Sequence, residues 1–100
     1  TAQPSRYPTG LLEIPMSPAS DIVCFRAQRW NRENFLRAIR AGLGWCVEHG
    51  AVYDFLSHPA CLYVTDPNFE AIDLICETVK QSKGRAAFAD LESVAGSVAV

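Results

Sequence analysis

The sequence predicts an α/β fold, in which parallel strands alternate with helices. One observation leads to this prediction, and a second bears on whether the domain is complete. Short apolar runs, typical of buried strands, alternate with two longer segments whose apolar residues recur every three to four positions, as on one face of a helix. The strands are also too few to close a sheet, so at least one edge would stay exposed. We therefore expect residues 1–100 to be a single partial domain of a larger sheet or barrel.

The composition indicates a packed core and argues against several classes of function. Hydrophobic residues make up 49% of the chain and charged residues 20%, as in globular domains. A net charge of −2 without a basic cluster argues against binding to nucleic acid. No apolar run approaches the roughly 20 residues that cross a membrane, and no signal peptide is visible. Four sparse cysteines do not form a disulfide framework; we expect them to be reduced, which favours a cytoplasmic location.

The first 30 residues are predicted to contain one strand. Residues 1–9 are polar, carry two prolines and are expected to be an extended entry segment. Residues 10–16 read as a strand that ends at Pro15 and Pro18. Residues 17–30 show no clear period, so we expect a loop, and long irregular loops in compact domains are often functional.

The first long helix is predicted between Asn31 and Gly50. Asn31 is expected to be its N-cap, and Gly50 is suited to the position just after its end. Gly42 and Gly44 lie inside the helix, and each costs roughly 1 kcal/mol of helix propensity. We therefore expect at least one of them to pack closely against a neighbour. The apolar face is formed by Phe35, Ile39, Leu43, Cys46 and Val47.

The segment after Gly50 is predicted to be the central strand. Residues 51–57 are mostly apolar, which is typical of a strand covered on both faces. Residues 59–65 are expected to form a loop, since Pro59 stops the strand. A third short strand is predicted at residues 86–89.

The second long helix is predicted to start at Asp66 and Pro67, an N-cap followed by a first helical position. Gly84 is expected to end this helix, and Asp90 to cap a short final helix over 91–94. The apolar stripe of the second long helix is expected at Phe69, Ile72, Ile75 or Cys76, and Val79.

A catalytic histidine is predicted at His58. It follows the central strand directly, and parallel α/β proteins hold their reactive groups at the carboxyl ends of their strands. An imidazole titrates near neutral pH, which suits a general acid or base. The alternative is a histidine that is hydrogen-bonded at the strand end for structural reasons, and the sequence leaves it open.

A zinc site is the second candidate. Cys46-x-x-His49 and His58-x-x-Cys61 have internal spacings that suit zinc. However, Cys46 belongs to the buried face of the first helix, and the central strand separates the two pairs. We therefore expect no four-ligand metal site in this chain.

Two aspartates are candidates for orienting His58. A carboxylate that accepts a hydrogen bond from a catalytic imidazole fixes its tautomer. Asp21 lies in the irregular loop, which can reach the strand end, whereas Asp54 is roughly 13 Å back along the strand. Trp30 closes the same loop and is a candidate for lining a substrate pocket, with core packing as the alternative.

Several of these residues together resemble the C-terminal half of the polysaccharide deacetylase (carbohydrate esterase) family. The resemblance spans about Gly10 to Val94, and its most specific piece is Leu56-x-His58 at the strand end. The other segments that carry it are Gly10–Pro15, Ser20-Asp21, Phe55–Pro59 and Asp66–Ile72.

This resemblance implies an irregular (β/α) barrel that removes N-acetyl groups from a glycan, or cleaves a related amide, with a divalent, zinc-like metal. By the same resemblance, His58 matches the general acid on the leaving amine, and Leu56 matches a leucine that lines the acetyl pocket. Asp21 would orient the histidine, and Arg6 is a candidate for the family arginine.

The metal ligands of that family are absent from the sequence, because it has no Asp-Asp pair and no His-x-x-x-His segment. The resemblance therefore implies that the ligands lie outside this chain, on an N-terminal half of the same barrel, and that the chain alone is inactive. A function of another class stays open. The chain could be a non-catalytic α/β module that oligomerises or binds a partner through its exposed sheet edge.

Overall fold

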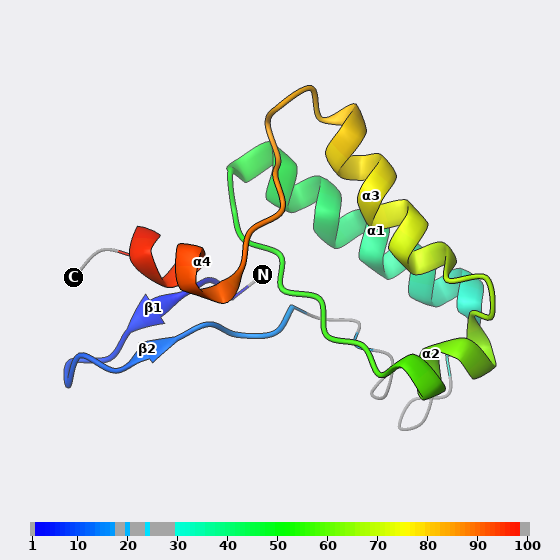
Figure 1. The fold of residues 1–100 in the computed structure, drawn as a ribbon, viewed down its shortest axis with the longest axis horizontal. Helices are drawn as coiled ribbons and strands as arrows, with labels where there is room; N and C mark the ends of the chain where they lie inside the picture. The colour runs from blue at the N-terminus through cyan, green and yellow to red at the C-terminus, as the bar shows by residue number, and fades with distance from the viewer. Residues whose placement is uncertain (1, 18–19, 21–23, 25–29, 99–100) are drawn as a thin grey trace.

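The computed structural model describes residues 2–17, 20, 24 and 30–98, and this part of the chain is mainly helical (Figure 1). Its sheet, within these residues, is one antiparallel pair of two-residue strands. The predicted α/β fold with parallel strands is therefore wrong. The elements are β1 (Ser5–Arg6), β2 (Leu12–Glu13), α1 (Arg32–His49), α2 (Pro59–Thr65), α3 (Glu70–Gln81) and α4 (Leu91–Ser97).

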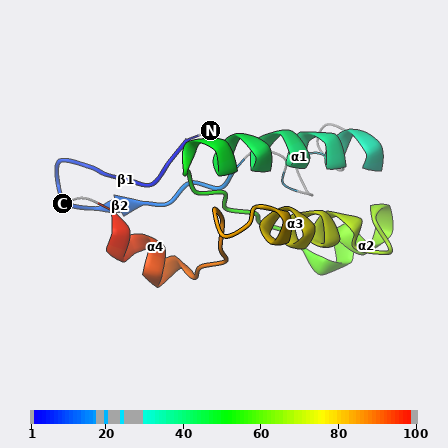
Figure 2. The same ribbon diagram turned by 90° about the horizontal axis from the view of Figure 1, so that it is seen from above.

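The elements form two groups. The long helices α1 and α3 pack against each other, with α2 at one end of the pair, while the hairpin and α4 lie on the other side of the molecule (Figures 1 and 2). Two extended segments, residues 51–58 and 85–89, run between the groups. The molecule is flat, with extents of 40 × 33 × 19 Å. A flat shape leaves much of the side-chain surface near solvent.

Helix α1 follows the sequence prediction closely. The Asn31 side chain accepts a hydrogen bond from the Asn34 amide at 2.8 Å, which confirms the predicted N-cap. Gly50 has φ 63°, a left-handed conformation that glycine adopts without strain, and its N–H donates to the Cys46 carbonyl. The buried side chains of the helix are Phe35, Ile39, Leu43 and Cys46, all of which belong to the predicted apolar face.

The close packing predicted for a glycine of this helix is found at Gly42. A Cβ atom at Gly42 would lie 2.7 Å from Cε2 of Tyr53, which is too close for a carbon–carbon contact. A Cβ atom at Gly44 would meet nothing within 4 Å. Only Gly42 is therefore required by packing.

The predicted central strand is extended but is not part of a sheet. Side chains take the place of a neighbouring strand along residues 51–58. Gln3 Oε1 accepts from the Val52 amide at 2.7 Å, and Gln3 Nε2 donates to the Val52 carbonyl at 3.1 Å. Ser17 makes the equivalent pair with Asp54, donating its N–H to the carbonyl and accepting from the amide at 2.9 Å each. These bonds satisfy the backbone groups of Val52 and Asp54 without a ladder.

The predicted loop at residues 59–65 is wrong, because this segment forms helix α2. Pro59 is at the start of the helix, where its missing N–H costs nothing. The Leu62 amide donates to the His58 carbonyl at 2.9 Å, and the Leu62 side chain is buried in the core. The proline therefore begins a helix at the position where it was expected only to stop a strand.

Helix α3 begins later than predicted, after a tight turn. The Asp66 side chain is fully buried, and its two oxygens accept from the amides of Glu70 and Ala71 at 2.9 Å each. The Asp66 carboxylate thus reaches the first amides of the helix across an intervening turn. The predicted N-cap is wrong, because the N-cap residue is Phe69, with φ 51°. A bulky side chain rarely adopts this left-handed conformation, which costs about 1–2 kcal/mol.

The ends of the chain depart from the prediction in strand pairing and in the length of the last helix, which runs over Leu91–Ser97 rather than 91–94. Residues 86–89 do not pair with a strand in the described part of the chain, so the predicted third strand is wrong. The Asp90 side chain accepts from the Ser93 amide at 2.8 Å, which confirms the cap of α4. Within the predicted strand 10–16, the paired residues are Leu12 and Glu13, and their partners come from the entry segment.

Candidate functional site

His58, the residue predicted to act as the general acid, does not lie at an edge of the described sheet. His58 is exposed and precedes the first residue of α2. Leu56, two residues earlier in the extended segment, is 42% exposed. Asp21 lies outside the described residues. Trp30 packs against the buried core, which corresponds to the packing alternative rather than to a pocket wall.

The two Cys/His pairs do not form a metal centre. His49 stacks on Trp45, with ring centroids 4.3 Å apart, and its Nδ1 lies 2.8 Å from the Trp45 carbonyl oxygen. Cys46 is buried on the same helix. Among the residues that the structure describes, no group of three or more His, Cys, Asp or Glu side chains could hold a metal ion.

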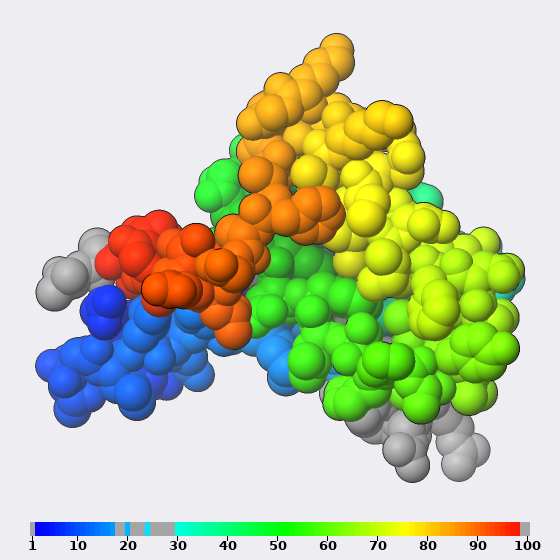
Figure 3. All heavy atoms as spheres, in the orientation of Figure 1, coloured from blue at the N-terminus to red at the C-terminus, as the bar shows by residue number. Residues whose placement is uncertain are grey.

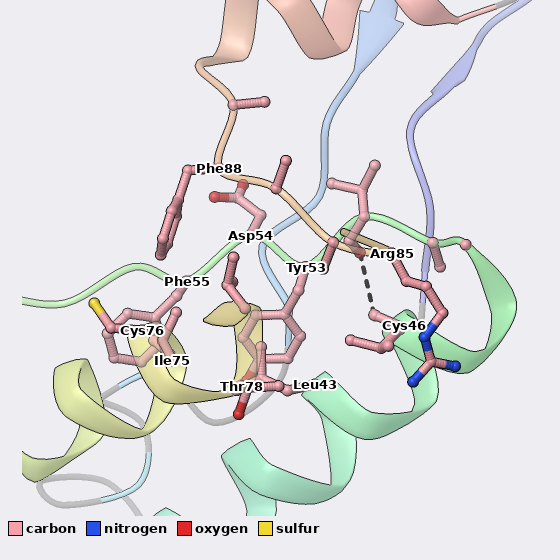
Figure 4. A pocket seen from close by; sticks show the side chains of 18 of the residues that line it. Leu43, Cys46, Tyr53, Asp54, Phe55, Ile75, Cys76, Thr78, Arg85 and Phe88 are labelled. Carbon is pink, nitrogen blue, oxygen red and sulfur yellow. Dashed lines mark hydrogen bonds between the residues drawn. The ribbon is translucent and has the colours of Figure 1, made fainter. Parts of the chain in front are cut away.

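An apolar groove of about 530 Å³ lies in the described part of the molecule. Its walls come from the C-terminal half of α1, the extended segment 51–55, α3 and the segment 85–89 (Figure 4). It opens between α3 and the segment 85–89 on the face drawn in Figure 3. The main apolar side chains of the wall are Leu43, Tyr53, Phe55, Ile75, Val79 and Phe88.

Two titratable side chains in the groove are held in their neutral forms. Burial raises the pKa of the Cys46 thiol, which donates to the Val52 carbonyl at 3.5 Å. Burial, followed by the nearby thiols of Cys46 and Cys24, raises the pKa of Tyr53 to about 12. A nucleophile or base needs the opposite shift, toward the charged form near neutral pH. Neither group is therefore activated as a nucleophile or a base.

Helix α3 is apolar on two faces. Its inner face, with Ala71, Leu74 and Ile75, belongs to the core or packs against it. A second set, here called the α3 stripe, lies on the groove side and toward solvent, so the predicted apolar stripe does not face the core. Phe69 and Ile72 are 37% and 39% exposed, Cys76 is an exposed free thiol and Val79 is half-buried. The α3 stripe consists of Phe69, Ile72, Cys76 and Val79.

An exposed aromatic pair extends the α3 stripe beyond the helix. The rings of Tyr63 and Phe69 have centroids 6.2 Å apart and are tilted by 45°. Tyr63 is 60% exposed, and the adjacent Val64 is 81% exposed. The sequence does not predict this surface, because residues 59–65 are expected to form a loop. The signal for it was the apolar run Cys61–Val64 directly after Pro59.

Comparison of the chain with family models, with curated proteins and with solved structures gives no match. The resemblance to the polysaccharide deacetylases therefore stays a prediction from the sequence. In the described residues, no helix has both the length and the apolar character needed to span a bilayer. The function has to be argued from the groove and the α3 stripe.

Proposed function

We propose that the chain is a non-catalytic interaction module, which binds another polypeptide along the α3 stripe and over the adjoining groove. One observation carries this proposal: α3 already packs its inner face against the core and still presents a second apolar face to solvent. Apolar side chains that gather on an exposed face usually mark an interaction site. The binding surface is thus a helix face, and not the sheet edge expected from the sequence.

The exposed area of the chain supports the same proposal. Its accessible surface is 6860 Å². A compact monomer of 11.0 kDa would expose roughly 5,600 Å². The excess of roughly 1,200 Å² exceeds the ~800 Å² that one partner buries in a standard protein–protein interface. One such interface would return the exposed area to the ordinary range.

The groove can be tested with the fluorescent apolar probe 1-anilinonaphthalene-8-sulfonate. At about 1 μM protein, we expect saturable binding of the probe. Ile72→Asp puts a charge on the groove wall and should weaken the binding at least about tenfold. Leu11→Asp is the matched control, because Leu11 is 66% exposed but lies in the hairpin. If the probe binds equally to both variants, and each variant keeps an unchanged circular dichroism spectrum, the result contradicts the proposed function.

Hydrolysis of an N-acetyl group or a related amide is a separate proposal, and it rests on the sequence resemblance alone. Its test is His58→Ala in a parent protein that also carries the metal ligands. The resemblance predicts a strong loss of turnover with metal still bound. Unchanged turnover would remove His58 as the general acid.

A further inference from the structure

We infer that the polypeptide bound at this site is a second copy of the chain, with α3 packed antiparallel against α3 of its partner about a two-fold axis. This inference rests on the proposed function and names its partner. Two features of α3 carry it: the spacing of the α3 stripe, and the charges that flank it.

The α3 stripe has the spacing of a two-helix seam. Its helical members, Ile72, Cys76 and Val79, lie four and three positions apart, as at the d, a and d positions of a heptad, and Phe69, the N-cap residue, lies three positions before Ile72. In an antiparallel pair, each a position of one helix lies beside a d position of the other. Phe69 would then face Val79 of the second copy, and Ile72 would face Cys76 of the second copy. The two-fold axis repeats each contact, so the stripe is complementary to itself.

The charges beside the stripe favour the antiparallel direction. Asp73 and Lys80 are both exposed, and each directly follows a stripe residue at a d position, Ile72 or Val79, so that each occupies an e position beside the seam. They therefore occupy equivalent flanking positions, seven residues apart. In an antiparallel pair these positions of the two helices face one another. Asp73 would thus lie beside Lys80 of the second copy, and Lys80 beside Asp73, giving two ion pairs of opposite sign.

The side chains around the stripe can enlarge this contact. α3 has 12 residues and is about 18 Å long, which is short for a stable helix pair alone. Tyr63 adds apolar surface beyond the start of α3, next to Phe69, and is 60% exposed. Phe88, from the far wall of the groove, is 65% exposed (Figure 4). Together they supply the apolar area that the two-helix seam lacks.

The experiment is sedimentation equilibrium of the full chain from about 1 to 100 μM, with three charge variants. We expect the wild type to be a reversible dimer. Asp73→Lys should weaken the dimer roughly tenfold, because it replaces two attractions by two repulsions. The double variant Asp73→Lys with Lys80→Asp should restore the dimer, because it exchanges the signs. Glu77→Lys is the control. It makes the same charge change on α3 but does not flank the stripe, and it should leave the dimer unchanged.

A disulfide tests the register independently of charge. In Ile72→Cys, the new thiol would face Cys76 of the second copy, so mild oxidation should give a disulfide-linked dimer. Gln81→Cys, at the polar end of α3, should link to a much smaller extent. Linking of the two variants to the same extent would contradict the antiparallel register.

The outcomes separate the two levels of the proposal. A wild type that is monomeric at every concentration but still binds the apolar probe in the groove would contradict the proposal that the partner is a second copy. It would not contradict the proposal that the chain is an interaction module. A dimer that neither Asp73→Lys nor the double variant alters also overturns the inference, because its contact lies elsewhere. Loss of probe binding together with a monomeric wild type overturns both.

Discussion

At Gly42 the first long helix passes so close to the ring of Tyr53 that a side chain has no space. The missing Cβ atom would be 2.7 Å from the ring carbon Cε2. Tyr53 in turn packs against the core cluster and forms part of the groove wall. The conformation of the extended segment therefore depends on this single glycine.

We expect Gly42→Ala to destabilise the fold by about 1–2 kcal/mol, because displacement of the Tyr53 ring outweighs the gain in helix propensity. Gly44→Ala adds the same methyl group two residues away, where nothing lies within 4 Å. It should stabilise the fold by about 0.5–1 kcal/mol. Urea unfolding of both variants measures the difference. Equal effects of the two substitutions would show that the Tyr53 contact has no energetic weight.

The raised pKa of Tyr53 predicts a loss of stability in alkali. The unfolded phenol loses its proton near pH 10, whereas burial keeps the folded phenol protonated up to a pKa of about 12. The unfolded state thus binds fewer protons in this window, and stability falls as the pH rises through it, by at most about 1.4 kcal/mol per pH unit. Tyr53→Phe should reduce the fall in free energy of unfolding measured between about pH 9 and pH 11. An unchanged slope would contradict the burial of the hydroxyl.

The features of single residues that could be predicted from the sequence are local ones. Asn31, Gly50 and Asp90 act within one helical turn of their own positions, so the sequence around each contains the information. The expected positions of Leu56 and His58, at the end of a strand in a sheet, depend on whether residues 51–57 pair with another strand. Such pairing involves residues far away in the sequence, so the local pattern could not predict that it is absent from the described structure.

Among the elements, the turn between α2 and α3 contains a residue with a strained backbone. Phe69 adopts a left-handed backbone conformation and presents its ring at the start of the α3 stripe. The buried carboxylate of Asp66 holds the turn through the amides of Glu70 and Ala71. Strained residues that the surrounding structure fixes in this way often lie at binding sites.

We expect Asp66→Ala to destabilise the fold by about 1–3 kcal/mol, because it leaves two amides without their acceptor, one of them buried. Asp66→Asn keeps one side-chain oxygen and should cost less than alanine. Thermal unfolding followed at 222 nm, the usual helix signal, compares the two. If both variants unfold at the same temperature as the wild type, the Asp66 cap does not contribute to stability.

Phe69→Gly should have opposite effects on folding and on association. Glycine accepts the φ of 51° without strain, so the monomer should keep its stability or gain up to about 1 kcal/mol. Loss of the ring should weaken self-association, because Phe69 is the first residue of the α3 stripe. Unfolding in urea and sedimentation of the same variant test both effects. A variant that is less stable and equally associated would contradict this account of the turn.

The extended segments show why the elements could be predicted only in part. The apolar pattern of residues 51–57 correctly indicates an extended chain. In this segment the backbone of Val52 is bonded to the side chain of Gln3, which lies 49 positions away in the sequence. The backbone of Asp54 is bonded to the hydroxyl and the amide of Ser17, which lies 37 positions away. Periodicity describes one segment at a time, so it cannot distinguish a ladder partner from side chains that replace it.

At the scale of the whole molecule, the sequence predicts an exposed sheet edge as the surface for a partner. The described residues form no parallel sheet, and their exposed apolar stripe lies on a helix. The sequence predicts an apolar stripe on the second long helix, yet α3 is apolar on two faces, and only the fold determines which one meets the core. The face that stays uncovered is the one with heptad spacing.

The account of the whole molecule depends on the α3 stripe as the surface that joins two copies. The most direct measurement is the mass of two variants in solution, alone and mixed. Asp73→Lys brings lysine beside lysine in a homodimer, and Lys80→Asp brings aspartate beside aspartate, so each variant alone should be mainly monomeric at about 10 μM. An equimolar mixture should form heterodimers, since every flanking pair is then of opposite sign. A mixture no heavier than its separate components would contradict the account.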